Sequence, residues 1–165
     1  MKNYILNREV AGKKLRRMAY EILERNAGET KLILAGIRDN GSAIARTIRR
    51  MLLEIAGTNL DIKLIDISLD KRKPREITLS ETLPFDDQVI IIVDDVASSG
   101  KTLLYAMKPF LEAHPRKIEC LVLVGRTHKA FPVYPDYIGL SLSTTLQEHI
   151  FVEVDGGDVA GAWLE

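Results

Sequence analysis

Five consecutive branched apolar residues at positions 89–93 constrain the fold of this chain more than any other segment. A fully apolar run of this length is typical of a strand buried on both faces, as in a parallel sheet with helices on either side. Two adjacent acids, Asp94 and Asp95, follow directly, and small residues come next. Because open α/β sheets bind ligands outside the carboxyl ends of their strands, this segment is the first candidate for a functional site.

The rest of the chain alternates between helical and extended patterns. Helical spacing of apolar residues occurs in three segments: 9–26, 42–55 and 101–113. Short apolar runs typical of strands occur at 31–37, 61–67, 118–124, 137–140 and 150–154. This order predicts an α/β fold with a parallel, Rossmann-like sheet, flanking helices and right-handed crossovers. Ser42 is expected to cap the second helix, and the polar residues 68–87 are expected to form a long loop or a hairpin.

Length and composition limit the class of protein. A chain of 165 residues fits one domain, residues 1–165, which needs no disulfide or metal to fold. The single cysteine, Cys120, cannot form an intramolecular bridge and suits a reducing compartment. The 23 basic residues balance the 23 acidic ones, so no overall charge draws the chain to nucleic acid or to an anionic membrane. No apolar run approaches the roughly 18 residues of a membrane span, and the expected location is the cytoplasm.

The turn after the two acids has the composition of a phosphate site. Its residues are Val96, Ala97, Ser98, Ser99, Gly100, Lys101 and Thr102. Unpaired N–H groups at a helix start and side-chain hydroxyls donate to phosphate, and glycine permits a turn that a Cβ would block. Ionised carboxylates only accept hydrogen bonds, so the two aspartates suit hydroxyl groups on the same ligand. A ribose 5-phosphate satisfies both requirements.

Two alternatives use the same residues. Gly100, Lys101 and Thr102 resemble the end of a nucleoside-triphosphate loop, but that loop needs a glycine five residues before Gly100, where this chain has Asp95. A turn of two acids that only caps a helix explains Asp94 and Asp95 by themselves. It does not explain the complete run from the apolar strand to the threonine.

Residues 90–102 resemble the phosphoribosyl pyrophosphate (PRPP) motif of the type I phosphoribosyltransferases. The likeness extends over roughly residues 5–155 and includes the PyrR-type branch, bifunctional pyrimidine-operon RNA attenuators with uracil phosphoribosyltransferase activity. Further matching stretches are 23–26, 34–37, 65–67 and 123–145. The resemblance implies that Asp94 and Asp95 hold the ribose hydroxyls and that residues 97–102 hold the 5′-phosphate.

The resemblance also implies where the other parts of the substrate bind. The pyrophosphate contacts would be Ile37, Arg38, Asp39 and Asn40. The base contacts would be Arg126, Tyr137 and Ile138, and residues 135–139 would form a small hood over the ring. Catalytic roles would fall to Asp94, Asp95 and Arg38. Mg²⁺ would be bound mainly through PRPP, with no side chain assigned as a metal ligand.

The implied reaction transfers ribose 5-phosphate from PRPP to a nucleobase, uracil by resemblance, and releases pyrophosphate. The protein would then be a pentosyltransferase of the glycosyltransferase class. The segment 69–85 departs from the family, because it is shorter and lacks the family's Tyr-Arg-Asp-Asp type start. This segment contains four basic residues, which either clamp pyrophosphate or belong to a solvated loop: Lys71, Arg72, Lys73 and Arg75.

The resemblance leaves a second function open, a nucleotide-responsive RNA-binding regulator of pyrimidine genes with weak or no catalysis. Zero net charge gives this alternative no direct support, although a local basic patch is possible. The residues available for such a patch are Lys13, Lys14, Arg16, Arg17, Arg46, Arg49 and Arg50. A solvated helix face is the more common explanation of such a cluster. The resemblance further implies a homodimer or a higher homo-oligomer.

Overall fold

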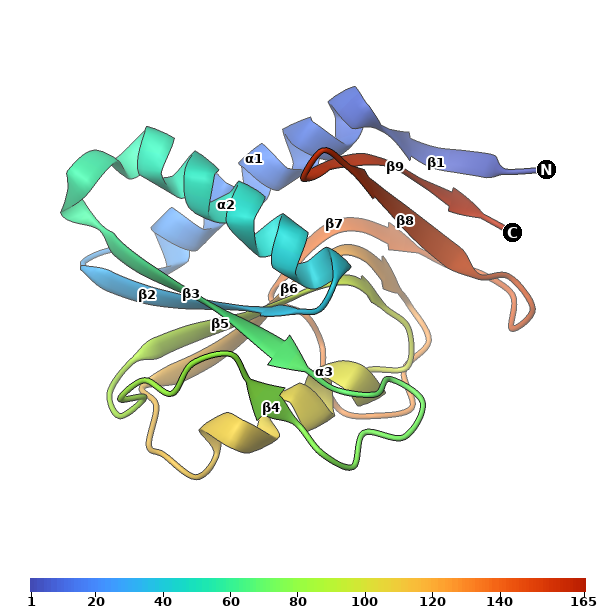
Figure 1. Ribbon diagram of the computed structural model, residues 1–165. Coiled ribbons are helices and arrows are strands. Elements are labelled where there is room, and N and C mark those ends of the chain that lie inside the picture. The colour runs from blue at the N-terminus through green and yellow to red at the C-terminus, as the bar shows by residue number, and fades with distance from the viewer.

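A six-stranded sheet forms the centre of the molecule in the computed structural model, which describes residues 1–165 (Figure 1). Its strand order is β4-β3-β2-β5-β6-β7. The strands are β2 (Lys31–Ile37), β3 (Asp61–Ser68), β4 (Thr78–Leu79), β5 (Val89–Ala97), β6 (Lys117–Arg126) and β7 (Tyr137–Leu142). All neighbours run parallel except β4, which is antiparallel to β3. The predicted α/β fold with a parallel sheet is therefore confirmed.

The apolar run 89–93 is part of β5, a central strand, and all five of its side chains are buried. The strand continues past the two acids to Ala97, further than its apolar run suggests. The physical reason is the register, because β6 pairs with β5 as far as Ala97 whereas the pairing with β2 ends at Val93. Asp94 and Asp95 therefore lie where one neighbouring strand continues and the other has already turned away.

Helices cover both faces of the sheet (Figure 1). One face carries α1 (Arg8–Arg25) and α2 (Asn40–Ala56), followed by the 3-10 turn η1 (Gly57–Asn59). The other carries α3 (Lys101–Ala106) and the 3-10 turn η2 (Lys108–Phe110). The helix expected over 101–113 is thus much shorter, and Pro109, whose nitrogen cannot donate a hydrogen bond, lies in the following 3-10 turn. Ser42 does not cap α2 but lies inside its first turn, where its hydroxyl donates to Gly36 O over 3.1 Å.

A second, antiparallel sheet of three strands stands beside the end of the central sheet and carries both chain termini (Figure 1). Its strands are β1 (Asn3–Asn7), β8 (Ile150–Asp155) and β9 (Asp158–Leu164), in the order β1-β9-β8. We call this sheet the hood. The sequence placed the hood at 135–139, and that prediction is wrong, because Tyr137 begins β7 of the central sheet. The pairing of β1 with β9 joins the two ends of the chain.

The segment between β3 and β5 contains only the two-residue strand β4 as regular structure. It therefore combines both expectations, a long loop and a short antiparallel pairing in which Ile67 lies opposite Leu79. Its apolar residues pack against the core on the α3 face: Leu69, Ile77, Leu79, Leu83 and Phe85. None of the helices has the length and apolar character required to cross a bilayer.

Candidate active site

The end of β5 presents two carboxylates in very different surroundings. The Asp94 side chain is 1% exposed and the Asp95 side chain is 15% exposed. Each carboxylate accepts a hydrogen bond from the next backbone amide, Asp94 Oδ1 from Asp95 N over 2.9 Å and Asp95 Oδ1 from Val96 N over 2.7 Å. These local bonds fix both carboxyl groups at the edge of the sheet.

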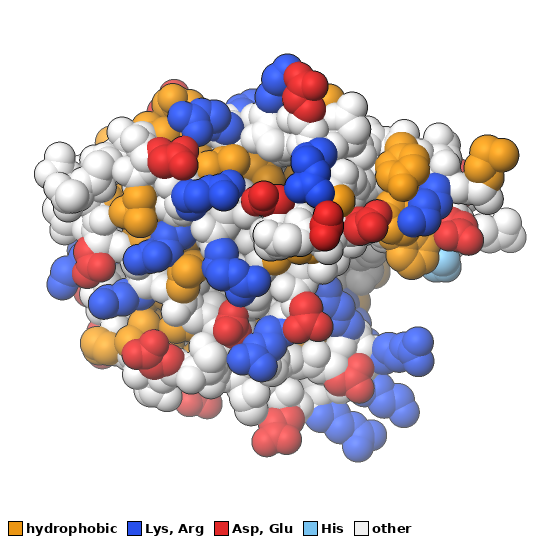
Figure 2. Space-filling view, turned by 45° about the horizontal axis from the view of Figure 1, so that its top comes forward, with side chains coloured by type: hydrophobic (Ala, Val, Ile, Leu, Met, Phe, Trp, Pro, Cys, Tyr) orange, Lys and Arg blue, Asp and Glu red, His pale blue; other side chains and the backbone are white.

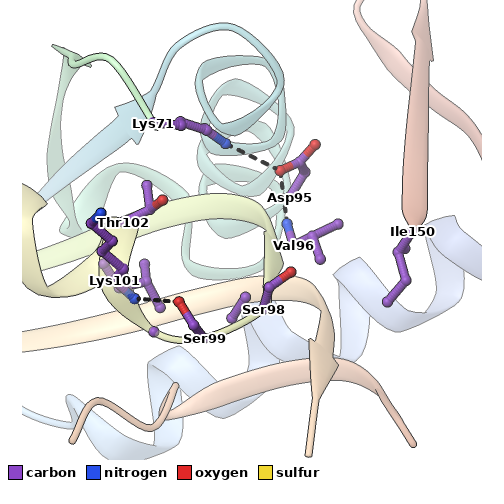
Figure 3. A pocket seen from close by; sticks show the side chains of 11 residues that line it. Lys71, Asp95, Val96, Ser98, Ser99, Lys101, Thr102 and Ile150 are labelled. Atoms are coloured by element: carbon purple, nitrogen blue, oxygen red, sulfur yellow. Dashed lines mark hydrogen bonds and ion pairs between the residues drawn. The ribbon is translucent and has the colours of Figure 1, made fainter. Parts of the chain in front are cut away.

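A cavity of about 270 Å³ opens directly beside Asp95. Its wall is formed by Asp95 and the seven residues 96–102, together with Lys71, Leu103 and Ile150. Figure 3 shows Lys71 reaching toward Asp95 from one side, the serine turn below, and Ile150 of the hood strand β8 on the opposite side. The structure thus brings Asp95 and the entire predicted phosphate turn to one cavity.

The turn itself depends on Gly100, which has a φ of 89°. A Cβ at this position would also lie 3.2 Å from Phe131 O and 3.3 Å from Val133 O, so glycine suits the turn on two grounds. The following helix α3 has only six residues, so its dipole contributes little. The turn therefore offers mainly its own amides and the hydroxyls of Ser98, Ser99 and Thr102.

The segment after β6 supports this turn. The carbonyl oxygen of Ser99 accepts hydrogen bonds from Ala130 N and Phe131 N over 3.0 and 3.1 Å. Lys129 Nζ donates to Arg126 O over 2.8 Å and approaches Ala97 O at 3.4 Å. Partial burial, with a smaller effect from the Arg126 charge, lowers the pKa of Lys129. Lys129 therefore ties the end of β6 to the start of the turn.

Electrostatics distinguishes the two acids from ordinary surface carboxylates. Burial raises the pKa of Asp94 to about 7; the neighbouring Asp95 charge adds to this rise and Lys71 opposes it. Lys71 Nζ lies 3.1 and 3.2 Å from the two Asp94 carboxylate oxygens and 3.7 Å from Asp95 Oδ1. Burial lowers the pKa of Lys71, but the two carboxylates outweigh it and the net pKa is raised.

The predicted pyrophosphate loop follows β2 and touches the acid pair through one residue. Asn40 Nδ2 donates to Asp95 Oδ2 over 3.0 Å and to Val152 O of the hood over 2.9 Å. A Cβ on Gly41 would overlap the Val93 carbonyl oxygen, so glycine permits α2 to begin directly against β5. The Arg38–Asp39 peptide bond is cis.

The remaining residues of this loop are placed differently from one another. The Ile37 side chain is fully buried, which leaves only its backbone for a ligand. The Arg38 side chain is half exposed and lies 3.5 Å from Asp66 Oδ2 of β3, and Asp39 is exposed. None of these three side chains lines the cavity beside Asp95.

The residues predicted to contact the base are separated by the structure. Arg126 lies at the end of β6, where its guanidinium donates to Thr145 O over 2.6 Å. Ile138 is half-buried and packs beneath Gly125 on the α3 face. The Tyr137 side chain is fully buried on the other face, and its hydroxyl donates to Glu119 over 2.8 Å. A ring enclosed in this way cannot stack on a base, so the part of the prediction that packs the Tyr137 ring on the base is wrong, whereas contacts from Ile138 and from the backbone of this segment stay a prediction.

Comparison with known proteins identifies the fold and its family. The phosphoribosyl transferase domain family matches residues 3–155. This chain belongs to that family. The bifunctional protein PyrR of Clostridioides difficile is 32% identical over 168 residues, which cover 95% of each chain. A PyrR protein of Enterococcus faecalis is 33% identical, covering 88% of this chain and 86% of the relative.

Solved structures agree with this placement at the level of the fold. A hypoxanthine phosphoribosyltransferase from Trypanosoma cruzi has a TM-score of 0.76 at 15% identity, covering 99% of this chain and 97% of that one. A hypoxanthine-guanine phosphoribosyltransferase from Bacillus anthracis has a TM-score of 0.72 at 17% identity, covering 86% and 83% of the two chains. The resemblance to type I phosphoribosyltransferases and to their PyrR-type branch is therefore confirmed.

Three residues of this candidate site were not singled out from the sequence in the positions that the structure gives them. The sequence singled out Lys71 only as one of four basic loop residues, yet it is the only one of the four that pairs with Asp94 and Asp95. Lys129 and Ile150 were not considered as site residues. Their side chains reach the site from loops and strands far away in the chain, and no periodicity or short motif signals such contacts.

The acid pair does not form a metal cage by itself. No group of three or more His, Cys, Asp or Glu side chains in the structure is placed to hold a metal ion. Two neighbouring aspartates beside a phosphate turn fit an ion whose other ligands come from the substrate, since Mg²⁺ commonly binds through one or two carboxylates plus phosphate oxygens.

The basic cluster of α1 and α2 is largely paired with acids. Figure 2 shows basic and acidic side chains interspersed over this face rather than a continuous basic surface. Four of the seven cluster residues have acidic partners: Lys13 with Glu9, Arg16 with Glu54, Arg17 with Glu21, and Arg50 with Asp158. The solvated-face explanation of this cluster fits these pairs better than a nucleic-acid surface does.

Proposed function

We propose that this protein transfers ribose 5-phosphate from PRPP to a nucleobase, with uracil as the base suggested by the PyrR-type resemblance. The observation that carries the proposal is the cavity in which the Asp95 carboxylate lies beside a turn rich in amide and hydroxyl donors, with the buried Asp94 carboxylate directly before it in β5. A ribose 5-phosphate suits this combination, since its hydroxyls donate to carboxylates and its phosphate accepts from amides and hydroxyls. The family membership of the chain supports the same reaction.

Each part of the site has a role in the proposed reaction. Asp94 and Asp95 accept hydrogen bonds from the ribose hydroxyls, and residues 96–102 bind the 5′-phosphate. The amides of the loop 37–40 and the Arg38 guanidinium bind pyrophosphate as it leaves. Arg126 and Ile138 remain the candidates for contacts with the nucleobase. The protein then acts by positioning the base nitrogen against ribose C1 and by stabilising charge as the bond from C1 to the pyrophosphate oxygen breaks and the bond from C1 to the base nitrogen forms.

Mg²⁺ belongs to the same proposal, held mainly through PRPP oxygens. When bound, it would neutralise charge on the pyrophosphate leaving group. The protein's own contribution is to leave room beside Asp95 and to keep that carboxylate fixed through the Asn40 amide.

Calorimetry and turnover assays test this function. The protein should bind PRPP with Mg²⁺, and a panel of bases with PRPP should show release of pyrophosphate, with uracil as the expected acceptor. The double substitution Asp94→Asn with Asp95→Asn should abolish PRPP binding while the circular dichroism spectrum stays unchanged. A double variant that keeps the PRPP affinity of the parent would disprove the ribose assignment.

Nucleotide-responsive regulation of pyrimidine genes through RNA binding, with weak or no catalysis, is a second candidate, favoured by the relatives that carry the name bifunctional protein PyrR. The paired charges on α1 and α2 do not supply an obvious surface for it. RNA binding through several phosphates would weaken steeply with rising salt. A salt series with a structured pyrimidine-operon leader RNA checks this, and a flat response would count against the regulator. Sedimentation in the same buffer checks the homodimer suggested by the resemblance.

A further inference from the structure

Lys71 differs from the other basic residues of its loop in the position of its charged group. The loop residues on either side of it, Asp70 and Arg72, are exposed. The Lys71 amino group instead lies within 3.2 Å of both Asp94 oxygens. It also lies 3.7 Å from Asp95 Oδ1, toward which Figure 3 shows it pointing. The amino group of this loop lysine therefore contacts both carboxylates of the acid pair, Asp94 and Asp95.

With Lys71 in this position, each of the four carboxylate oxygens of the pair has a protein partner. Both Asp94 oxygens contact Lys71, and one of them also accepts from Asp95 N. Asp95 Oδ1 accepts from Val96 N, and Asp95 Oδ2 accepts from Asn40. Because Asp94 is only 1% exposed, it has no open side for a further donor while the lysine remains. A sugar hydroxyl can reach Asp94 only by taking the place of the lysine.

The loop is built so that this exchange is feasible. The Lys71 side chain is 45% exposed, so its amino group has solvent beside it when it leaves. The hydrogen bonds of the neighbouring loop residues are local, from Arg72 N to Asp70 Oδ1 and from Arg75 N to Lys73 O. Departure of Lys71 therefore breaks no other long-range contact of these residues.

We propose that Lys71 is an internal counter-ion that occupies the ribose-hydroxyl position of the acid pair, so that binding of a sugar phosphate and release of the loop at Lys71 are coupled. This inference rests on the proposed function, because it takes the acid pair as the sugar site. It differs from a simple pyrophosphate clamp, since it assigns Lys71 a competing role before any pyrophosphate is present. The apparent affinity for a ligand falls by the fraction of molecules in which the site is free.

Ribose 5-phosphate is the probe that separates these roles, because it has the hydroxyls and the 5′-phosphate but no pyrophosphate. Calorimetry would compare the parent protein with Lys71→Met and with Lys73→Met, a matched control that removes the same charge from the same loop. Lys71→Met should bind roughly three- to tenfold more tightly than the parent, as expected when a competing internal group is removed. Lys73→Met should bind no more tightly than the parent.

The outcomes distinguish this inference from the proposed function. If the parent binds ribose 5-phosphate and Lys71→Met binds equally or more weakly, the inference is overturned and the sugar site survives. If none of the three proteins binds it, the sugar site fails and the inference fails with it. Thermal melts of each variant show whether the fold is retained.

Amine labelling supplies a second measurement on the unmodified protein. Acetic anhydride labels free amines, and mass spectrometry reads Lys71 and Lys73 separately. Saturating ribose 5-phosphate should raise the labelling rate of Lys71 several-fold while that of Lys73 stays constant. An unchanged or lower rate at Lys71 would show that the lysine stays on the acids when the sugar binds, and would overturn the proposal.

Discussion

The side-chain amide of Asn40 joins three parts of the molecule that are far apart in the chain. It donates to Asp95 Oδ2 over 3.0 Å and to Val152 O over 2.9 Å. One residue at the start of α2 thereby fixes a carboxylate of the central sheet and holds the hood strand β8 beside it. The position of the acid pair therefore depends on contacts from both sheets.

Replacing Asn40 with Ala should remove both bonds and leave Asp95 with one fewer donor. A hydrogen bond to a charged group contributes about 1.5–3 kcal/mol, so we expect the free energy of unfolding to fall by about 1–3 kcal/mol. PRPP affinity should fall as well, because Asp95 is no longer held in place. Urea denaturation and calorimetry measure the two effects. Asn59→Ala, at an exposed site, is the matched control and should change neither.

The raised pKa of Asp94 predicts a specific dependence of stability on pH. Because its folded-state pKa, about 7, lies above the ordinary aspartate value of 3.8, the folded protein holds an extra proton between these values. The contribution of this group to stability therefore falls as pH rises from about 4 to about 7, by at most about 4 kcal/mol, and is constant above. Asp94→Asn should remove this slope. Denaturation curves at several pH values test it, and parallel profiles for parent and variant would contradict it.

The glycine at position 41 should be far less replaceable than the glycine at position 12. A Cβ on Gly41 meets backbone atoms of β5, whereas nothing lies within 4 Å of one on Gly12. Gly41→Ala should destabilise the protein by more than about 2 kcal/mol, in the range of overpacked cores. Gly12→Ala lies inside α1 and should instead stabilise it by about 0.5–1 kcal/mol. Equal denaturation midpoints for the two variants would refute the close approach of α2 to β5.

Tyr137→Phe separates a structural role of this residue from a role in binding. Loss of the hydroxyl removes a buried hydrogen bond to Glu119 and should cost about 1–2 kcal/mol of stability. Affinity for a nucleoside monophosphate should not change, because the ring is enclosed in the core. Tyr134→Phe, at a side chain that is 72% exposed, should alter neither property. A weaker nucleotide complex with normal stability would restore Tyr137 to the base site.

Much of the fold was readable from the sequence because it depends on near neighbours. The apolar run before Asp94 identifies a strand buried on both faces, and the spacing of apolar residues gives α1 and α2 to within a few residues. The phosphate turn 96–102 is one contiguous segment, so its residue types are sufficient to suggest its chemistry. The same locality made the alternation of helices and strands, and hence the parallel sheet, predictable.

The tertiary structure alone decided which side chains meet. The hood requires β1 to pair with β9 at the opposite end of the chain, and Lys71 meets Asp94 only because β3 and β5 end at the same edge of the sheet. Tyr137 was misassigned because its position in a motif does not show which face of β7 its ring occupies. Sequence patterns report periodicity over a few residues, whereas register, strand order and side-chain direction are set by packing between segments that are distant in the chain.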